Sequence, residues 1–450
     1  MANPNIAFLN DLLSNVGSAV RGRIVAAGSD QSAEERLSAS CRELMRRGGE
    51  ATRIAAAEQA LEAFAELGDA AKLRFFRTLL TDYSADPEAI RAAYARWEEE
   101  RSEPALSALF GAVEPRRQSL LRRLNYPSGG TLRLVRMRKD LLRLMADAPD
   151  LAPIDDDFSH LLKSWFNRGF LEMRRIDWNS PAAILDKIVA YEAVHAIRDL
   201  DDLRRRLEPP DRRCYAFFHP ATGDEPLIFV EVALCAAIPD AIGPLLAGDT
   251  AHEDGSGDTA VFYSISNCQP GLKGISFGNF LIKQVAADLA AALPHLRTFV
   301  TLSPAPGFAR WLAAREEPEG AALSEALTRG DWREDDAARD ALAPKVQAWA
   351  ARYIAEARSG SGQPLDPVAR FHLGNGASAH RVNWPADFAP TALSRAHGVM
   401  INYLYEPGRI EARHEAFANE GTIATGPELR RALKGARAAA PDRTRQKDAT

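Results

Sequence analysis

The sequence contains few cysteines and none of the patterns that would give them a structural task. Only four occur among 450 residues, at Cys41, Cys214, Cys235 and Cys268, and no two form a C-x-x-C pair. Sparse, unpatterned cysteines are typical of reduced thiols and argue against a disulfide framework or a structural zinc site. We therefore expect a protein of a reducing compartment, with the cytoplasm as the default location.

The sequence also lacks an excess of positive charge and any long apolar run. Lys plus Arg number 56 and Asp plus Glu number 61, which gives a net charge of −5. A chain that binds nucleic acid is expected to be basic, so no nucleic-acid partner is predicted. No window approaches eighteen consecutive apolar residues, and the first residues lack the basic start of a secretory signal. We expect neither a membrane span nor a secretory signal.

No strong strand signal occurs before about residue 210. Ser32 and Glu35 have the spacing of a capping box, and Asp86 followed by Pro87 is typical of a helix start. Apolar residues then recur at helical spacing, as in Leu73, Phe76 and Leu80. The sequence predicts an all-helical domain over residues 1–173. A helical domain of this length leads us to expect a homo-oligomer, either a dimer or a tetramer.

The pattern changes after residue 210. Short apolar or aromatic runs bounded by Pro, Gly and Asp predict strands, namely "CYAFFH", "PLIFVEVALC", "AVFYSIS", "TFVTLS", "VARFHLG" and "VMINYLY". The stretch "GNFLIKQVAADLAAAL" between two of them has helical spacing, and residues 313–358 also read as helical. Strands interrupted by helices predict a mixed α/β domain over residues 174–426. Residues 427–450 are basic and Ala-rich, and we expect a flexible tail there.

A glycine-rich segment connects a predicted strand to a predicted helix at residues 269–279. Gly271, Gly274 and Gly278 allow backbone N–H groups to approach a ligand, and Lys273 adds a positive charge. This combination suits a phosphate or pyrophosphate group. The segment is neither a Walker A loop nor a dinucleotide-binding G-x-G-x-x-G, and an ordinary strand-to-helix turn is the commoner origin of such a pattern.

Two further residues have the chemistry of an active site. Ser303 ends the run "FVTLS", and prolines at 304 and 306 prevent the strand from continuing. His372 lies in a run read as a strand, beside a glycine turn, where it could act as a general acid or base. For either residue alone, a purely structural role is the commoner case. The other histidines show no spacing that would form a zinc site.

Taken together, these segments resemble one family. The stretches "FYSISNCQPGLKGISFGNFLIKQV", "LSPAPGFARWL", "DPVARFHLGNGA", "NWPAD" and "GVMINYLYE" are similar to the malonyl-CoA decarboxylase family, in order and in spacing. The resemblance covers at least residues 176–405. It implies an α+β protein in which a helical N-terminal domain precedes an acetyltransferase-like (GNAT-type) catalytic domain.

The resemblance also implies an activity, that of a carboxy-lyase that converts malonyl-CoA to acetyl-CoA and CO₂ without metal or cofactor. It places the catalytic groups at Ser303, His372 and Tyr405. The CoA-facing loop of the family falls on Lys273, Gly274, Ile275, Ser276, Phe277, Gly278 and Asn279. Animal members carry a glutamate in this loop where the present chain has Ser276, so no catalytic carboxylate is assigned there.

The chemistry implied is enolate formation followed by protonation. Loss of CO₂ leaves negative charge on the thioester oxygen, which hydrogen-bond donors stabilise. A Ser303–His372 pair can then supply a proton to the α-carbon, and Ser303 and Tyr405 could orient the substrate carboxylate. The residues do not determine which member of the pair handles which proton. Two other functions remain open: an acyl-CoA-dependent acyltransferase on the same fold, or a non-catalytic acyl-CoA-binding regulatory protein.

Overall fold

The computed structural model describes residues 32–248, 257–275 and 280–439. The chain divides into two compact units. Unit 1 comprises residues 1–172 together with two short later segments, 218–227 and 269–276, and unit 2 comprises the remainder. The main division falls next to the predicted boundary at residue 173. The glycine-rich segment, however, is grouped with the helices of unit 1 and not with the sheet.

Unit 1 is helical, as the sequence predicts. Its α-helices are α2 (Ala33–Met45), α3 (Glu50–Glu66), α4 (Asp69–Thr81), α5 (Pro87–Glu100), α6 (Glu103–Val113), α7 (Arg116–Leu124), α8 (Gly130–Leu144) and α9 (Ala152–Trp165). Single-turn 3₁₀ segments are η1 (Pro149–Leu151), η2 (Arg168–Phe170), η3 (Pro220–Thr222) and η4 (Pro270–Leu272). The capping box of Ser32 and Glu35 is present, and Asp86 caps α5.

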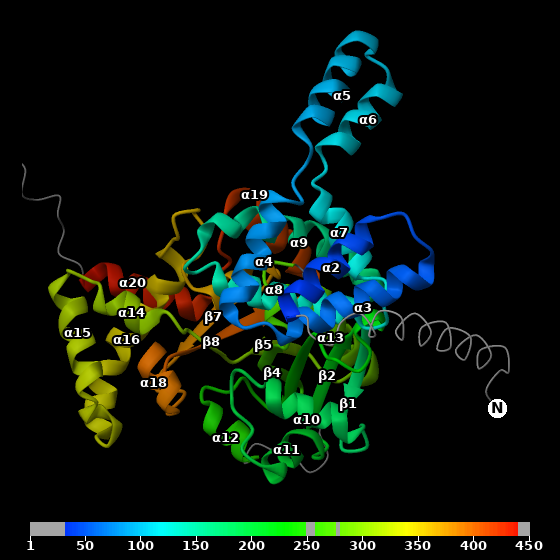
Figure 1. The fold of residues 1–450 in the computed structure, drawn as a ribbon. Helices are drawn as coiled ribbons and strands as arrows, with labels where there is room; N and C mark the ends of the chain where they lie inside the picture. The colour runs from blue at the N-terminus through cyan, green and yellow to red at the C-terminus, as the bar shows by residue number, and fades with distance from the viewer. Residues whose placement is uncertain (1–31, 249–256, 276–279, 440–450) are drawn as a thin grey trace, which may run out of the picture. The chain divides into compact units, whose positions relative to one another are not determined.

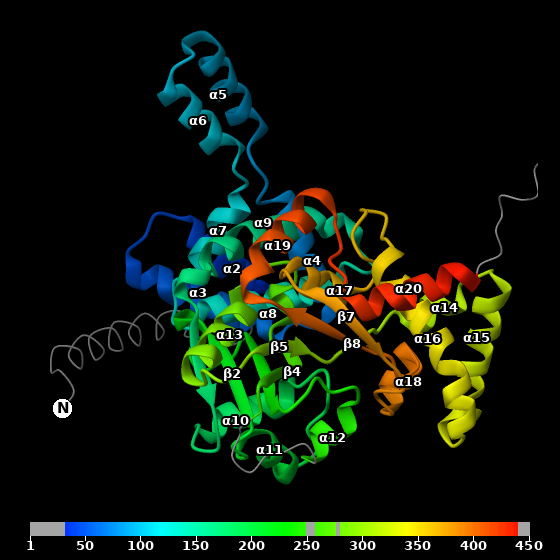
Figure 2. The ribbon, with the colours of Figure 1, turned by 180° about the vertical axis from the view of Figure 1, so that it is seen from behind.

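The helices α5 and α6 form a hairpin that stands apart from the other helices of unit 1 (Figures 1 and 2). Helix α5 has no buried residue, and Ala105 is the only buried residue of α6. Tyr94, Phe110 and Val113 are exposed on this hairpin. A pair of helices with so little buried surface gains little stability from its own packing.

Unit 2 is built on a mixed eight-stranded sheet with the order β1-β2-β3-β4-β5-β8-β6, and β7 also pairs with β8. The strands are β1 (Glu172–Ile176), β2 (Arg212–Phe218), β3 (Ile228–Cys235), β4 (Thr259–Asn267), β5 (Thr298–Thr301), β6 (Ser303–Pro304), β7 (Ser378–Asn383) and β8 (Met400–Tyr405). Strands β4 and β5 run parallel, with Thr259 opposite Thr298, and the other registered pairs are antiparallel. This arrangement confirms the predicted α+β class with a helical N-terminal part.

Helices lie between and around these strands. They are α10 (Ala182–Tyr191), α11 (Leu200–Leu207), α12 (Ile242–Ala247), α13 (Phe280–Ala292), α14 (Phe308–Ala313), α15 (Pro318–Arg329), α16 (Asp336–Glu356), α17 (Pro367–Gly374), α18 (Pro390–Ala396), α19 (Ile410–Glu420) and α20 (Pro427–Ala439), with 3₁₀ segments η5 (Asp331–Arg333) and η6 (Pro407–Arg409). Figure 1 shows α14, α15, α16 and α20 gathered near one end of β7 and β8.

Three expectations about local structure were wrong. Residues 172–176 form β1 although no strand was expected before residue 210. The run "VARFHLG" lies in helix α17, not in a strand. Residues 427–439 form helix α20, in which Leu429 is fully buried, so this part of the expected tail is helical. Residues 440–450 lie outside the described part of the chain.

Successive side chains of each strand point to opposite sides, so the sheet has two faces. Val261, Val300 and Leu302 belong to one buried apolar cluster, together with Met400. Because successive strand residues point to opposite faces, Thr301 between Val300 and Leu302 faces the other side. The candidate active site is built on that second face.

Candidate active site

Ser303 is placed by a break between two strands. Strand β5 ends at Thr301, and Ser303 with Pro304 forms the short strand β6, in which Ser303 pairs with Ile401 of β8. The strand therefore does not stop at Ser303 but pairs once more, through Pro304, before the chain turns. The side chain of Ser303 is buried, with 6% of the residue exposed. The prolines limit the conformations of the turn that follows.

His372 is placed by a helix and not by a strand. Asp366 caps α17 and Pro367 occupies its first turn, which puts His372 in the last turn of this short helix. His372 is 2% exposed. Burial lowers the pKa of its imidazole to about 3. The ring is therefore neutral at physiological pH, and only one of its two nitrogens carries a hydrogen.

The three predicted catalytic residues come together in one hydrogen-bonded row. The Oγ of Ser303 lies 2.9 Å from Nε2 of His372, and Nδ1 of His372 lies 2.9 Å from the hydroxyl of Tyr405. The Ser303 hydroxyl also donates to Oγ1 of Thr301 at 3.0 Å. Burial raises the pKa of Tyr405 well above its usual value, so its hydroxyl keeps its proton.

The donors and acceptors of this row fit one tautomer of the imidazole. With Ser303 donating to Thr301, its contact with His372 is satisfied in the tautomer whose ring hydrogen is on Nε2. Nδ1 then has a free lone pair, and Tyr405 donates to it. The direction of donation runs from Tyr405 through His372 to Ser303. Tyr405, for which a role in orienting the substrate carboxylate is expected, contacts the imidazole of His372.

Residues beneath the row hold it in place. The ring of Tyr403 stacks on the imidazole of His372, with centroids 4.6 Å apart and an interplanar angle of 25°. The backbone N–H of Tyr403 donates to Oγ1 of Thr301 at 3.2 Å. The side-chain amide of Asn402 donates to the carbonyl of Thr301 at 2.9 Å. Strand β8 thus supports Ser303 through its pairing with Ile401 and through Thr301, and it supports His372 through the ring of Tyr403.

Asp366 links the helix of His372 to the turn after Ser303. Its Oδ1 accepts from the backbone N–H groups of Val368 and Ala369, both at 2.9 Å, and its Oδ2 accepts from the hydroxyl of Tyr353 at 3.0 Å. The backbone of Gly307 also bonds to Asp366. A Cβ at Gly307 would lie 2.2 Å from the Tyr353 hydroxyl, so only glycine fits there. Burial raises the pKa of Asp366, and these four hydrogen bonds oppose that rise.

Sequence reasoning missed Thr301 and Asp366. Asp366 precedes a proline, the same helix-start signal that was used at Asp86. Applied here, that signal would have identified both the cap and helix α17. Thr301 carries no local signal, because its role depends on the pairing of strands distant in sequence.

The predicted CoA loop is described only in part, and within unit 1. Lys273 is exposed, Gly274 has a positive φ of 77°, and Ile275 is buried and closes a turn by donating to the carbonyl of Leu272 at 2.9 Å. The remaining members of the predicted loop lie outside the described residues: Ser276, Phe277, Gly278 and Asn279.

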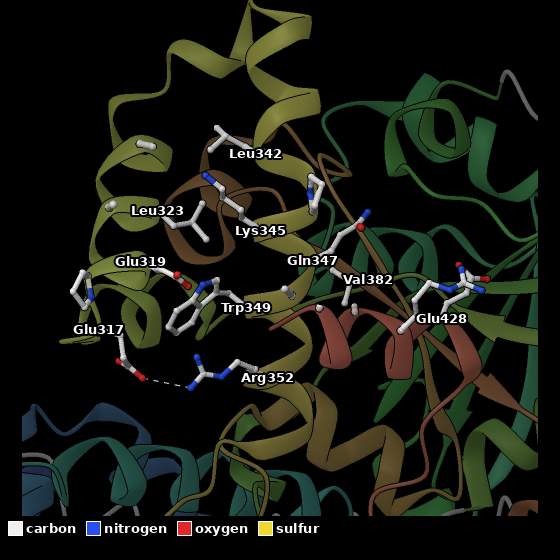
Figure 3. Close-up of a pocket in the computed structure, with 18 of the residues that line it drawn as sticks. Glu317, Glu319, Leu323, Leu342, Lys345, Gln347, Trp349, Arg352, Val382 and Glu428 are labelled. Carbon is white, nitrogen blue, oxygen red and sulfur yellow. Dashed lines mark hydrogen bonds and ion pairs between the residues drawn. The ribbon is translucent and has the colours of Figure 1, made fainter. Parts of the chain in front are cut away.

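The described residues of unit 2 line a large and a smaller cavity, among others. One of about 1410 Å³ is lined by helices α15, α16 and α20 and by β7, and Figure 3 shows Trp349 and the Glu317–Arg352 ion pair in it. None of the three predicted catalytic residues lines it. A smaller one of about 350 Å³ is lined by Tyr405 together with Arg297 and Arg409. Of the three predicted catalytic residues, Tyr405 lines this smaller cavity, and Ser303 and His372 do not.

No three His, Cys, Asp or Glu side chains gather as a metal site would require, within the part of the chain that the structure describes. None of the helices described is long and apolar enough to cross a bilayer.

The burial of His372 gives a testable pH dependence of stability. The native ring binds a proton only near pH 3, whereas an unfolded histidine does so near its usual pKa of about 6.5. Between these values the unfolded state binds more protons, so the free energy of unfolding falls as the pH is lowered, by at most ~1.4 kcal/mol per unit for this one group. Denaturant titrations at several pH values should give a shallower fall for His372→Asn. Parallel curves for the two proteins would contradict the buried neutral ring.

Family models match most of the described chain, from residue 83 onward. The malonyl-CoA decarboxylase C-terminal domain matches residues 169–443, and the N-terminal domain of the same family matches residues 83–166. The chain belongs to the malonyl-CoA decarboxylase family, a family of carboxy-lyases.

Individual relatives agree with this assignment. The mitochondrial malonyl-CoA decarboxylase of Anser anser anser is 34% identical over 368 residues, which is 73% of either chain. The crystal structure of malonyl-CoA decarboxylase from Rhodopseudomonas palustris is 48% identical, with a TM-score of 0.85, and covers 89% of this chain and 100% of that one. The enzyme from Agrobacterium vitis is 46% identical, with a TM-score of 0.82 and coverages of 89% and 99%.

Proposed function

We propose that this protein decarboxylates malonyl-CoA to acetyl-CoA and CO₂, with Ser303 and His372 at the reacting atoms. Family membership supports the reaction. The observation that carries the assignment of residues is the buried row in which Ser303, His372 and Tyr405 are joined by two hydrogen bonds of 2.9 Å each.

The direction of donation in this row favours protonation over nucleophilic attack. In a hydrolase triad the third residue is a carboxylate that accepts from Nδ1, which leaves Nε2 free to take the serine proton. Here the third residue is Tyr405, whose protonated hydroxyl can donate to Nδ1, and in the proposed tautomer Nε2 carries the hydrogen. Ser303 is therefore supplied with a proton and is not deprotonated. A row in which each hydrogen bond is donated toward Ser303 is suited to stabilise and protonate an enolate.

The proposed step balances as follows. The bond between the α-carbon and the carboxylate breaks, its electron pair forms the enolate, and CO₂ leaves. Ser303 gives its hydroxyl proton to the α-carbon. His372 then passes the hydrogen on Nε2 to the oxygen of Ser303, and the hydroxyl of Tyr405 gives its proton to Nδ1 of His372. An enolate is a much stronger base than a phenolate, so the transfer is downhill. Before the transfer, the Ser303 hydroxyl can donate to the thioester oxygen, where the charge develops.

Tyr405 must then recover a proton from solvent. It lines the cavity of about 350 Å³ that also contains Arg297 and Arg409. Water that enters this cavity is the proposed source of the proton. In this proposal the substrate reacts at Ser303, and the proton from solvent enters at Tyr405, the other end of the row.

We further propose that residues 273–279 bind the phosphate groups of CoA. The exposed Lys273 and the glycine backbone support this assignment. The helical region of residues 1–173 is proposed to mediate a dimer or tetramer, for which the exposed Tyr94, Phe110 and Val113 offer apolar surface. A cytoplasmic location is proposed from the sparse cysteines.

Incubating the purified protein with malonyl-CoA alone tests the function. A decarboxylase releases CO₂ and forms acetyl-CoA in equal amounts. An acyltransferase needs an added amine or hydroxyl acceptor, and a binding protein leaves malonyl-CoA unchanged. The absence of CO₂ from a preparation that binds acetyl-CoA would favour one of these two alternatives.

Tyr405→Phe should separate proton supply from substrate binding. The variant loses only the hydroxyl that donates to Nδ1 of His372. We expect kcat to fall by roughly 10-fold or more, at the lower end for a positioned acid, while KM changes little. Steady-state kinetics on malonyl-CoA measure both constants. A rise in KM at constant kcat would instead place this hydroxyl on the substrate.

A further inference from the structure

The segment that carries Lys273 is held by an arginine of the N-terminal helices. Nη1 of Arg138, on α8, donates to the carbonyls of Gly271 at 2.7 Å and of Lys273 at 2.9 Å. The same guanidinium bonds Asp155 through Nε at 2.7 Å and through Nη2 at 3.2 Å, and Nη2 also donates to Ser159 at 2.9 Å. Arg138 is 2% exposed. All of these residues belong to unit 1.

The backbone around these carbonyls is pressed against α8. A Cβ at Gly271 would lie 1.9 Å from the carbonyl oxygen of Val135, so no other residue fits without moving the segment. Leu272 is buried, and its N–H closes a turn with the carbonyl of Gln269 at 2.9 Å. Contacts with α8 therefore constrain the conformation of the segment from Gln269 to Ile275.

This contact fixes the orientation of one peptide group. The peptide between Lys273 and Gly274 is trans, so its C=O and N–H point in opposite directions. Because the carbonyl of Lys273 points to Arg138, the N–H of Gly274 points away from it. A carbonyl oxygen turned toward a phosphate would repel it, whereas an N–H group attracts it.

We infer that Arg138 is a positioning residue for the binding of CoA esters. It keeps the carbonyls of Gly271 and Lys273 away from the phosphate groups and presents the N–H of Gly274 to them. This inference rests on the proposed role of residues 273–279. It gives the helical N-terminal region a part in substrate affinity, in addition to any part in assembly.

Arg138→Lys tests the inference, because it keeps the charge but loses the planar fork that spans two carbonyls and a carboxylate. We expect the dissociation constant of acetyl-CoA, measured by calorimetry, and the KM of malonyl-CoA to rise by roughly 10-fold, the effect of losing one hydrogen bond to a charged group. The kcat should stay within about two-fold, because the lost contact stabilises the bound substrate and the transition state equally. The control is Arg143→Lys, on the same helix, where the guanidinium pairs with the exposed Asp69.

A purely structural role predicts a different result. If Arg138→Lys lowers the Tm but leaves the dissociation constant and KM at wild-type values, the inference is wrong. Should this variant fail to fold, Asp155→Asn removes the charge that holds Arg138 and leaves the arginine in place. It should weaken acetyl-CoA binding by roughly 3-fold, the effect of one ordinary hydrogen bond, and unchanged binding would again refute the inference. A wild-type protein that binds no acetyl-CoA would refute the proposed loop itself.

Discussion

Replacing Ser303 by Ala or His372 by Asn should each lower kcat by roughly 100-fold or more, the usual scale for a positioned acid or oxyanion donor. The two residues share one hydrogen bond of 2.9 Å and, in the proposed step, pass the same proton. Residues that act as a unit give strongly non-additive losses. The double variant should therefore be scarcely slower than the slower single variant. Single-turnover decarboxylation of malonyl-CoA by the four proteins measures this.

Acetyl-CoA binding and two control variants separate this result from its alternatives. Acetyl-CoA affinity should survive in all three variants, because the proposed phosphate contacts are made by other residues. Ser394→Ala and His160→Asn change the same residue types at exposed positions and should match the wild type. Losses that multiply in the double variant would mean that Ser303 and His372 perform separate tasks. A near-wild-type rate in either single variant would remove that residue from the active site.

Asp366→Ala should have the second largest effect, although Asp366 does not touch the reacting atoms. Losing the cap of α17 costs about 0.5–2 kcal/mol, and leaving the Tyr353 hydroxyl and the Gly307 N–H unpaired adds about 1–3 kcal/mol each. Both the helix of His372 and the turn after Ser303 lose an anchor. A displacement near 1 Å can cost roughly 100-fold in rate, so we expect kcat to fall by about that factor.

Kinetics and denaturant unfolding on two comparison variants separate displacement from general instability. Asp335→Ala removes the equivalent cap of α16, where Asp335 accepts from Ala338, and should lose stability without losing kcat. Asp366→Asn retains an oxygen for the cap and should keep most of the activity. If Asp366→Ala unfolds more easily but turns over at the wild-type rate, Asp366 does not position the Ser303–His372 pair.

Sequence periodicity and helix signals were sufficient for most of the fold. The capping box at Ser32, the Asp86–Pro87 start and five of the six apolar runs read as strands gave the correct elements. These features are local, so a single sequence displays them. The site residues came instead from the resemblance to a family, since Ser303 and His372 are 69 positions apart and their contact is a product of the fold.

The errors have physical causes. Strand β1 is an exposed edge strand with the sequence Glu-Met-Arg-Arg-Ile, which buries only Ile176 and so shows no apolar alternation. The run "VARFHLG" has an apolar content that suits a strand, but the cap at Asp366 and the proline after it start a helix. We expected a tail at residues 427–439 because the segment contains few large apolar residues. A short helix needs few of them to pack, and among the described side chains of α20 that of Leu429 is fully buried.

The most direct test of the central claim, that the row donates a proton to an enolate, is product analysis after turnover of malonyl-CoA in ²H₂O. The account predicts CO₂ and acetyl-CoA in equal amounts, with one deuterium in each new methyl group, because the proton on the α-carbon comes from exchangeable hydroxyls. Formation of malonate and free CoA would contradict it. That result would mean that Ser303 attacks the thioester, and that the row from Tyr405 through His372 to Ser303 works in the opposite direction.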